Sequence, residues 1–106
     1  MYKFIWKIKI SDESQVEPFI ANWREASIIL QEYPGAKGTR LHRSCDDPLE
    51  LYAIAEWESK ADRDAMEADR VAGSERGKRW DALMKNHDFG AVEPVARLEQ
   101  IEEILP

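Results

Sequence analysis

Four tryptophans are the residues of this chain best suited to hold a flat ligand. Trp6 and Trp57 lie in alternating apolar stretches, whereas Trp23 and Trp80 lie in stripes with helical spacing. Indole rings stack on flat aromatic molecules, so these four residues predict the wall of a substrate-binding cavity. The alternative is ordinary core packing, which accounts for most buried aromatic side chains. Asn22 is a further binding candidate, because an amide facing the cavity would orient a ligand oxygen; otherwise it occupies a solvated helix position.

His87 and Arg76 are the candidate catalytic residues. A histidine with a pKa near neutrality can accept a proton from a weakly acidic ligand. His87 ends the stripe begun by Trp80, although a histidine at a helix C-terminus is also favoured by the helix dipole without any function. Arg76 would stabilise the resulting anion, or it is one of several solvated charges in the segment 75–79.

Other familiar kinds of site find no support in the sequence. It contains no Gly-rich phosphate loop, no Ser-His-Asp order and no carboxylate pair with hydrolytic spacing. The single cysteine, Cys45, cannot form an intramolecular disulfide, and no cluster of His or carboxylate residues accompanies it as zinc ligands. We therefore expect no metal site and no cofactor.

Length and charge narrow the class of protein further. The 106 residues fit a single domain over 1–106, and 21 acidic against 15 basic residues give a net charge of −6. An acidic domain repels phosphate backbones, so nucleic acid is not an expected partner. Lysines interrupt the apolar N-terminus, and no apolar run approaches the roughly 18–20 residues of a membrane helix. We expect a soluble, cytoplasmic protein that does not bind membranes.

Hydrophobic periodicity predicts the elements that must position these candidates. Strict alternation predicts a strand over Tyr2–Ile10, with its aromatic residues on one face. Ser14 and Glu17 have the spacing of a helix-capping box, which predicts a helix from there to the Pro-Gly pair at 34–35. The apolar stripe of this helix contains Val16, Phe19, Ile20, Trp23, Ser27 and Leu30.

The second half of the chain completes a ferredoxin-like order. Two strands, over 36–45 and 49–58, are joined by a turn at 46–48. A capping-box-like start at Ser59 predicts a short helix that Gly73 breaks, and Ser74 begins another that Gly90 closes. The last strand, over 91–104, must bulge or lie at an edge around its proline. The resulting β-α-β-β-α-α-β order predicts an α+β fold with a four-stranded antiparallel sheet.

Strand phases predict the register and the assembly. In the strand order 4-1-3-2 the first and third strands are neighbours, which places lysines 3, 7 and 9 beside glutamates 56 and 58. The same register brings Phe4, Trp6 and Ile8 beside Ala53, Ala55 and Trp57. Helices on one face of the sheet leave Ile5, Tyr52 and Ile54 uncovered on the other. We therefore expect a homodimer in which two sheets pack face to face and the end of the last strand pairs with the partner.

Three stretches together resemble the antibiotic biosynthesis monooxygenase family. They are Tyr33-Pro34-Gly35-Ala36-Lys37-Gly38, Arg43-Ser44-Cys45-Asp46-Asp47-Pro48 and Ala55-Glu56-Trp57-Glu58-Ser59. The resemblance covers nearly the whole chain in element order, and the Glu-Trp-Glu-Ser stretch is its most specific part. It implies a dimeric α+β barrel with a ligand cavity between the sheet and the helices of each subunit.

Catalytic members of that family oxidise polycyclic phenols to quinones with molecular oxygen and without metal or flavin. They carry an asparagine four residues before the signature tryptophan and an arginine on a later helix; here these positions are Ala53, Trp57 and Arg76. The haem-cleaving branch uses a strand asparagine, a tryptophan and an iron-ligating histidine. Those positions here are Lys7 or a neighbour, Met66 and Arg76, so haem cleavage is not expected.

Three hypotheses for the function follow. The first is a cofactor-independent monooxygenase-like protein that holds a small aromatic or polyketide-like molecule between Trp6 and Trp57, with His87 as proton acceptor and Arg76 as anion stabiliser. The second is a non-catalytic, small-molecule-binding or stress-associated dimer of the same fold. The third is a cofactor-free isomerase or mutarotase, which also needs only a general base.

Overall fold

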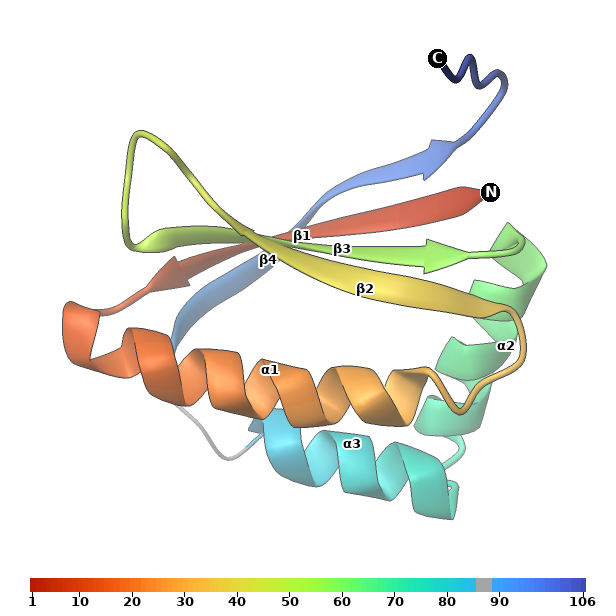
Figure 1. Cartoon of the computed structure of the whole chain (residues 1–106). Coiled ribbons are helices and arrows are strands. Elements are labelled where there is room, and N and C mark those ends of the chain that lie inside the picture. The colour runs from red at the N-terminus through yellow and green to blue at the C-terminus, as the bar shows by residue number, and fades with distance from the viewer. Residues whose placement is uncertain (86–88) are drawn as a thin grey trace.

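The computed structural model describes residues 1–85 and 89–106, and its element order is the predicted one (Figure 1). The elements are β1 (Tyr2–Ile10), a short 3-10 helix (Glu13–Gln15), α1 (Val16–Leu30), β2 (Ala36–Arg43), β3 (Glu50–Trp57), α2 (Lys60–Val71), α3 (Glu75–Lys85) and β4 (Gly90–Glu99). The fold is α+β with a four-stranded antiparallel sheet, which confirms the predicted fold class.

The sheet has the predicted strand order, read across as β2-β3-β1-β4. In its centre Phe4 lies opposite Ala55 and Trp6 lies opposite Ala53, which places two large rings beside two methyl groups. The alternation of a strand sends all four of these side chains to the same face of the sheet. This register therefore creates room on that face, beside the aromatic residues of β1.

The lysines of β1 are paired with carboxylates, although not all with those predicted. Lys3 contacts Glu56 at 3.4 Å, as expected. Lys7 and Lys9 lie toward the other end of β3, at 3.8 and 3.7 Å from Glu50, and Lys9 also contacts Asp47 at 2.6 Å. The predicted pairing of Lys7 or Lys9 with Glu58 is wrong. Because β1 and β3 are antiparallel, Glu58 lies beyond the end of β3 that is far from these lysines, at 3.5 Å from Lys37.

Helix α1 covers the sheet, and its start differs from the prediction. The side chain of Asp12, rather than Ser14, caps the short 3-10 helix by accepting a hydrogen bond from the backbone N–H of Ser14 at 2.8 Å. Gln15 occupies the N-cap of α1 without a side-chain cap, and Pro18 falls in the first turn, where its missing N–H is tolerated. The predicted cap at Ser59 is confirmed, since its hydroxyl accepts from the backbone N–H of Asp62 at 3.2 Å.

Two apolar clusters form the core, one toward each end of the sheet. The first contains Ile8, Ile10, Val16, Phe19, Leu51 and Phe89. The second contains Tyr2, Phe4, Tyr33, Trp57 and Met66. Trp6 is only partly buried and packs against both clusters. The middle of the molecule, between the clusters, is therefore where side-chain packing is incomplete.

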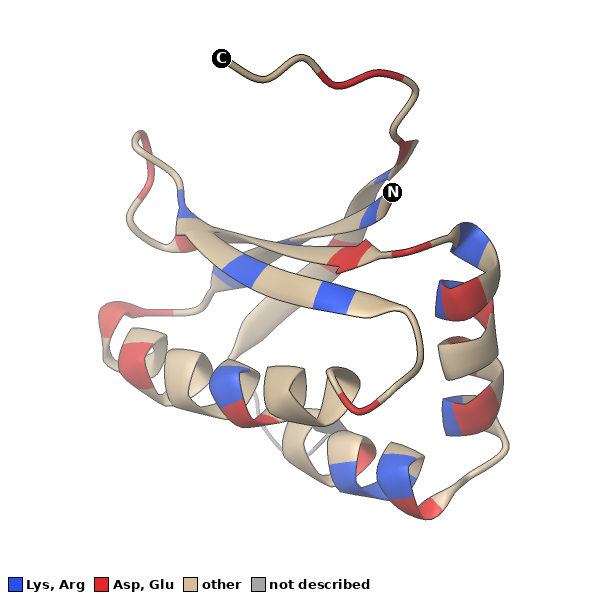
Figure 2. Ribbon diagram, turned by 45° about the vertical axis from the view of Figure 1, so that its right-hand side comes forward, with Lys and Arg blue, Asp and Glu red and all other residues tan. Residues whose placement is uncertain are grey.

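Helices α2 and α3 extend this core away from the sheet. Figure 1 shows α2 standing at one end of the sheet and α3 lying against α1. Helix α2 carries both basic and acidic residues along its length (Figure 2). The phenol of Tyr33 donates a hydrogen bond to Asp69 at 2.6 Å, and the Ser74 hydroxyl donates to the same carboxylate at 2.5 Å, which ties the end of α1 to the α2–α3 turn. None of the described helices is long and apolar enough to span a membrane.

The other face of the sheet has no helix on it (Figure 1). Edge strand β4 has the predicted irregularity, because its register on β1 skips a residue between Ala96 and Pro94. It ends at Glu99 rather than at residue 104, and residues 100–106 leave the sheet as an extended tail. Ile101, Ile104 and Leu105 in that tail are largely exposed.

Gly77 sets how closely α3 approaches α2. A Cβ atom added at this buried glycine would lie 2.8 Å from the Cα of Arg70, a backbone atom that cannot turn away. We expect Gly77→Ala to lower the free energy of unfolding by about 1–3 kcal/mol, the usual cost of overpacking. Without the contact, alanine in a helix would instead raise it by about 1 kcal/mol. Thermal or urea unfolding distinguishes the two signs, and Lys78→Ala at the adjacent exposed position is the control, expected within about 0.5 kcal/mol of wild type.

Candidate functional site

A cavity of about 170 Å³ lies in the middle of the molecule, between the sheet and the three helices. Its floor is formed by β1 and β3, one wall by α1, and the remaining walls by α2 and α3. Ala53 and Ala55 lie along the floor beside Trp6 and Phe4, and Ala26 faces them from α1. Small side chains beside large rings leave this volume unfilled, which explains why the cavity lies between the two core clusters.

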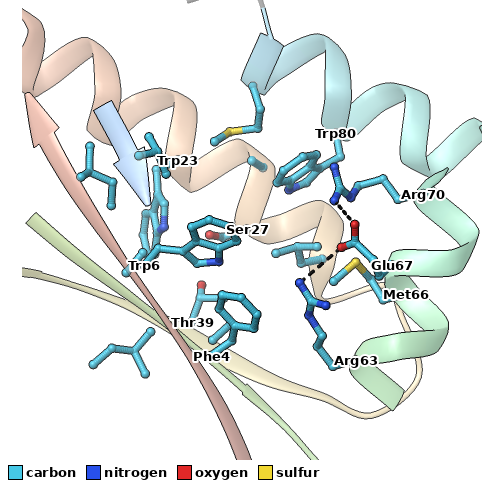
Figure 3. A pocket seen from close by; sticks show the side chains of 18 of the residues that line it. Phe4, Trp6, Trp23, Ser27, Thr39, Arg63, Met66, Glu67, Arg70 and Trp80 are labelled. Atoms are coloured by element: carbon cyan, nitrogen blue, oxygen red, sulfur yellow. Dashed lines mark hydrogen bonds and ion pairs between the residues drawn. The ribbon is translucent and has the colours of Figure 1, made fainter. Parts of the chain in front are cut away.

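All four tryptophans of the chain line the cavity, and Figure 3 shows Trp6, Trp23 and Trp80 there. Trp6 stacks on Phe4 with ring centroids 4.8 Å apart, and Trp23 and Trp80 approach from α1 and α3. Trp57 is 2 % exposed and also belongs to a core cluster. This residue therefore both lines the cavity and packs in the core. The structure thus brings the predicted aromatic residues to one place, while their contact with a ligand stays a prediction.

Two hydroxyl-bearing residues supply uncharged polar groups to the lining. Ser27 is a buried polar residue on α1, and Thr39 lies on β2. Their hydroxyls can donate and accept hydrogen bonds, so they are candidates for contact with a polar group of a ligand. Trp80, which also lines the cavity, has a buried Nε1 that lacks an acceptor among the described residues.

Arg63, Glu67 and Arg70 form the charged wall of the cavity. Their spacing of four and three residues places them on one face of α2. The Glu67 carboxylate accepts a hydrogen bond from Arg70 at 2.5 Å and lies 3.3 Å from a nitrogen of Arg63 (Figure 3). Arg70 also contacts Asp81 of α3 at 3.5 Å. The hydrogen bond from Arg70 is the main cause that lowers the pKa of Glu67, so this carboxylate is ionised at neutral pH.

Aromatic rings hold both guanidinium groups in place. Arg63 lies 4.4 Å from the ring centroid of Phe4, and Arg70 lies 4.5 Å from that of Trp80. These cation–π contacts combine with the ion pairs to Glu67 to fix the arginines at the edge of the apolar volume. The charged wall is therefore an ordered part of the cavity rather than a row of freely moving surface side chains.

Asn22 and Arg76 are not among the described residues that line this cavity. The Asn22 amide donates a hydrogen bond to the backbone carbonyl of Leu83 and so joins α1 to α3, outside the lining. Arg76 lies over the ring of Tyr33 at 4.5 Å and donates to the carbonyl oxygen of Glu32 at 2.7 Å. The expectation that Arg76 is the cavity cation does not fit this position, because its guanidinium is engaged at the end of α1. His87 lies outside the described residues.

Sequence reasoning missed the charged wall because charged residues on a helix are usually solvated. The signal was present in the spacing of residues 63, 67 and 70, which share a face with the buried Met66 rather than opposing it. Among the described residues, no group of three or more His, Cys, Asp or Glu side chains comes close enough to hold a metal ion.

Comparison with known proteins identifies the fold. No protein-family model matches the chain, and no curated protein sequence matches it significantly. Solved structures do match. One is SnoaB, a cofactor-independent oxygenase from Streptomyces nogalater, in a single-residue variant: TM-score 0.75 and 13 % identity over 97 % of this chain and 95 % of that one.

Two further structures show the same likeness. A Bordetella bronchiseptica protein, provisionally described as an antibiotic biosynthesis monooxygenase, has a TM-score of 0.72 and 20 % identity over 95 % of this chain and 97 % of its own. A protein from Nitrosomonas europaea with the same description has a TM-score of 0.70 and 17 % identity over 96 % of this chain and 100 % of its own. The chain therefore has the fold of the antibiotic biosynthesis monooxygenases, as the resemblance in sequence implied.

Proposed function

We propose that this protein is a cofactor-independent, monooxygenase-like protein that acts on a small aromatic molecule held in the central cavity. The observation that carries the proposal is that all four tryptophans of the chain line one cavity. Apolar walls with a few polar groups are typical of small-molecule sites. Trp6 and Trp57 on the floor, with Trp23 and Trp80 on the helices, offer ring faces to a flat ligand from several sides.

The volume of the cavity limits the size of the ligand. An engineered protein cavity of about 150 Å³ takes up benzene. The 170 Å³ here is thus suited to one ring, or to two fused rings after small side-chain movements. A polycyclic phenol of three or more rings would require a larger rearrangement, so we place the substrate among one- and two-ring compounds.

The reaction is the less strongly supported part of the proposal. A monooxygenase of this kind places one atom of molecular oxygen on an activated ring carbon as a carbonyl and releases the other atom as water. The substrate must first lose a proton, and Glu67 is a poor acceptor because two arginines hold it in its ionised form. His87 remains the proposed proton acceptor. The likeness to SnoaB supports the reaction only through a shared fold.

Ala53 favours a second candidate, a protein that binds its ligand without turnover. It lies on the cavity floor opposite Trp6, at the position where the resemblance places an asparagine. A methyl group there cannot hydrogen-bond a phenol or an oxygenated intermediate.

Filling the cavity tests the binding part of the proposal. We expect Ala53→Leu to weaken the binding of 2-naphthol, measured by titration calorimetry, by about tenfold or more, a loss of 1.4 kcal/mol. The added methyl groups occupy the floor beside Trp6. Ala61→Leu, at an exposed position of α2, is the matched control and should bind as wild type does. Equal affinity of both variants, with intact folds by circular dichroism, would place the ligand elsewhere.

Oxygen consumption tests the reaction. With one- and two-ring phenols in chelator-treated buffer, we expect oxygen uptake and release of the oxidised product, followed by an oxygen electrode and mass spectrometry. His87→Ala should lower the rate by about 10²-fold or more, the usual contribution of a general base. Binding with no uptake across the panel would reject the oxygenase and leave the second candidate. Conversion of a substrate in an anaerobic sample would instead indicate an isomerase.

We further propose that two copies of the chain pack through the open faces of their sheets. That face carries Ile5, Tyr52, Ile54 and Leu98 between rows of lysines and glutamates, so a copy rotated onto it meets charges of both signs. The exposed apolar tail, 100–106, extends from the same sheet and could reach the partner. A closed two-fold dimer would cover both.

Light scattering after size-exclusion chromatography tests the dimer, and the expected mass is twice the 12.3 kDa of one chain. Leu98→Glu, on the open face, should shift the protein toward the monomer because it buries a charge in the interface. Ile28→Glu changes an equally apolar residue on the exposed side of α1 and should leave the dimer intact. A wild-type mass of one chain contradicts the proposal.

A further inference from the structure

The charged wall contains two cations and one anion. Glu67 lies between Arg63 and Arg70, and Asp81 of α3, which is not a lining residue, contacts Arg70 at 3.5 Å. No other charged side chain lines the cavity in the part of the chain that the structure describes. Each arginine of the wall therefore already faces a carboxylate.

We propose that Glu67 makes this cavity selective for uncharged ligands, which are one- or two-ring aromatic alcohols or ketones, over the corresponding carboxylates. The inference rests on the proposed function, since it concerns the same cavity. Glu67 lies between the two arginines and occupies the place that a ligand carboxylate would need in order to pair with both. A specificity of this kind comes from the repulsion of the wrong ligand as much as from attraction to the right one.

The distances show why an anionic ligand would gain little binding free energy from the two arginines. Glu67 already lies at 2.5 Å from Arg70 and 3.3 Å from Arg63, within the range of direct ion pairs. The side chains of Arg63, Glu67 and Arg70 are only 17, 32 and 24 % exposed, so water screens these charges less than it screens surface pairs. A ligand carboxylate would lose its own hydration in the apolar cavity and would meet the carboxylate of Glu67 beside each cation.

A neutral ligand avoids that cost and finds partners of the right kind. The hydroxyls of Ser27 and Thr39 can both donate and accept a hydrogen bond. The Nε1–H of Trp80, a third lining residue, has no acceptor among the described residues. None of these three groups carries a charge. The uncharged polar atoms of the lining thus match an alcohol or a ketone.

Two ligands of nearly the same shape but different charge distinguish the effect of ligand charge on affinity from the effect of ligand shape. 2-Naphthol is neutral at pH 7, whereas 2-naphthoate is an anion at that pH. In titration calorimetry we expect wild-type protein to bind 2-naphthol at least about tenfold more tightly than 2-naphthoate. Glu67→Gln should raise the affinity for 2-naphthoate by about tenfold or more and change the affinity for 2-naphthol by less than about threefold. Glu58→Gln removes the same charge from a residue paired with Lys37 outside the cavity and should change neither affinity.

A second variant tests the inference even if Glu67→Gln does not fold. Asp81→Asn removes the carboxylate of α3 that contacts Arg70 at 3.5 Å, and should also strengthen 2-naphthoate binding, by a smaller factor. Wild-type protein that binds the two ligands equally, or folded Glu67→Gln that does not gain affinity for 2-naphthoate, would overturn the inference and leave the cavity as the binding site. Failure of 2-naphthol to bind wild-type protein would overturn the proposed function and the inference with it.

Discussion

The pairing of β1 with β3 is the constraint on which the rest of this structure depends. Opposite Trp6 and Phe4 the register places Ala53 and Ala55, and opposite Lys3 it places Glu56. A slip of one residue would send the aromatic rings to the open face and the charges into the core, so the hydrophobic pattern holds the register firmly. The same pairing thus produces a charged, uncovered face on one side of the sheet and a floor with unfilled space on the other.

Leaving that space unfilled has a cost that the fold must offset elsewhere. Apolar side chains that line such a space have no packing partner on one side and lose those van der Waals contacts. Polar contacts at the edge hold the walls apart. The hydrogen bonds from Tyr33 and Ser74 to Asp69 fix the α2–α3 turn, and the arginines of α2 are fixed by Glu67. A costly space with ordered walls is what a ligand site requires, and simple packing defects lack such walls.

Much of the fold, and the aromatic part of the site, could be predicted from the sequence because both follow from periodicity. Alternation over Tyr2–Ile10 fixes which face carries Trp6, and the strand order follows from the ferredoxin-like arrangement. The charged part was missed. Spacing places residues 63, 67 and 70 on one face of α2, but the direction in which α2 and α3 present their side chains depends on the turn at Gly73 and the close approach at Gly77, which no periodicity describes. Arg76 was predicted to face the cavity from the family resemblance, although its neighbours in space are Tyr33 and Glu32.

The charged wall also bears on which chemistry this fold can support. Apolar surroundings raise the pKa of a bound phenol, whereas a nearby cation or a hydrogen-bond donor to its oxygen lowers it. Here both cavity arginines already face carboxylates, so forming a phenolate in the cavity gains little from them. An oxygenase with these walls would need its base outside α2. The same walls suit a protein that only binds, since a neutral ligand requires no base at all. The solved structures, at 20 % identity or less, share only the fold with this chain. Whether a protein of this fold oxygenates its ligand or only binds it is determined by the polar atoms of the cavity and not by the sheet around them.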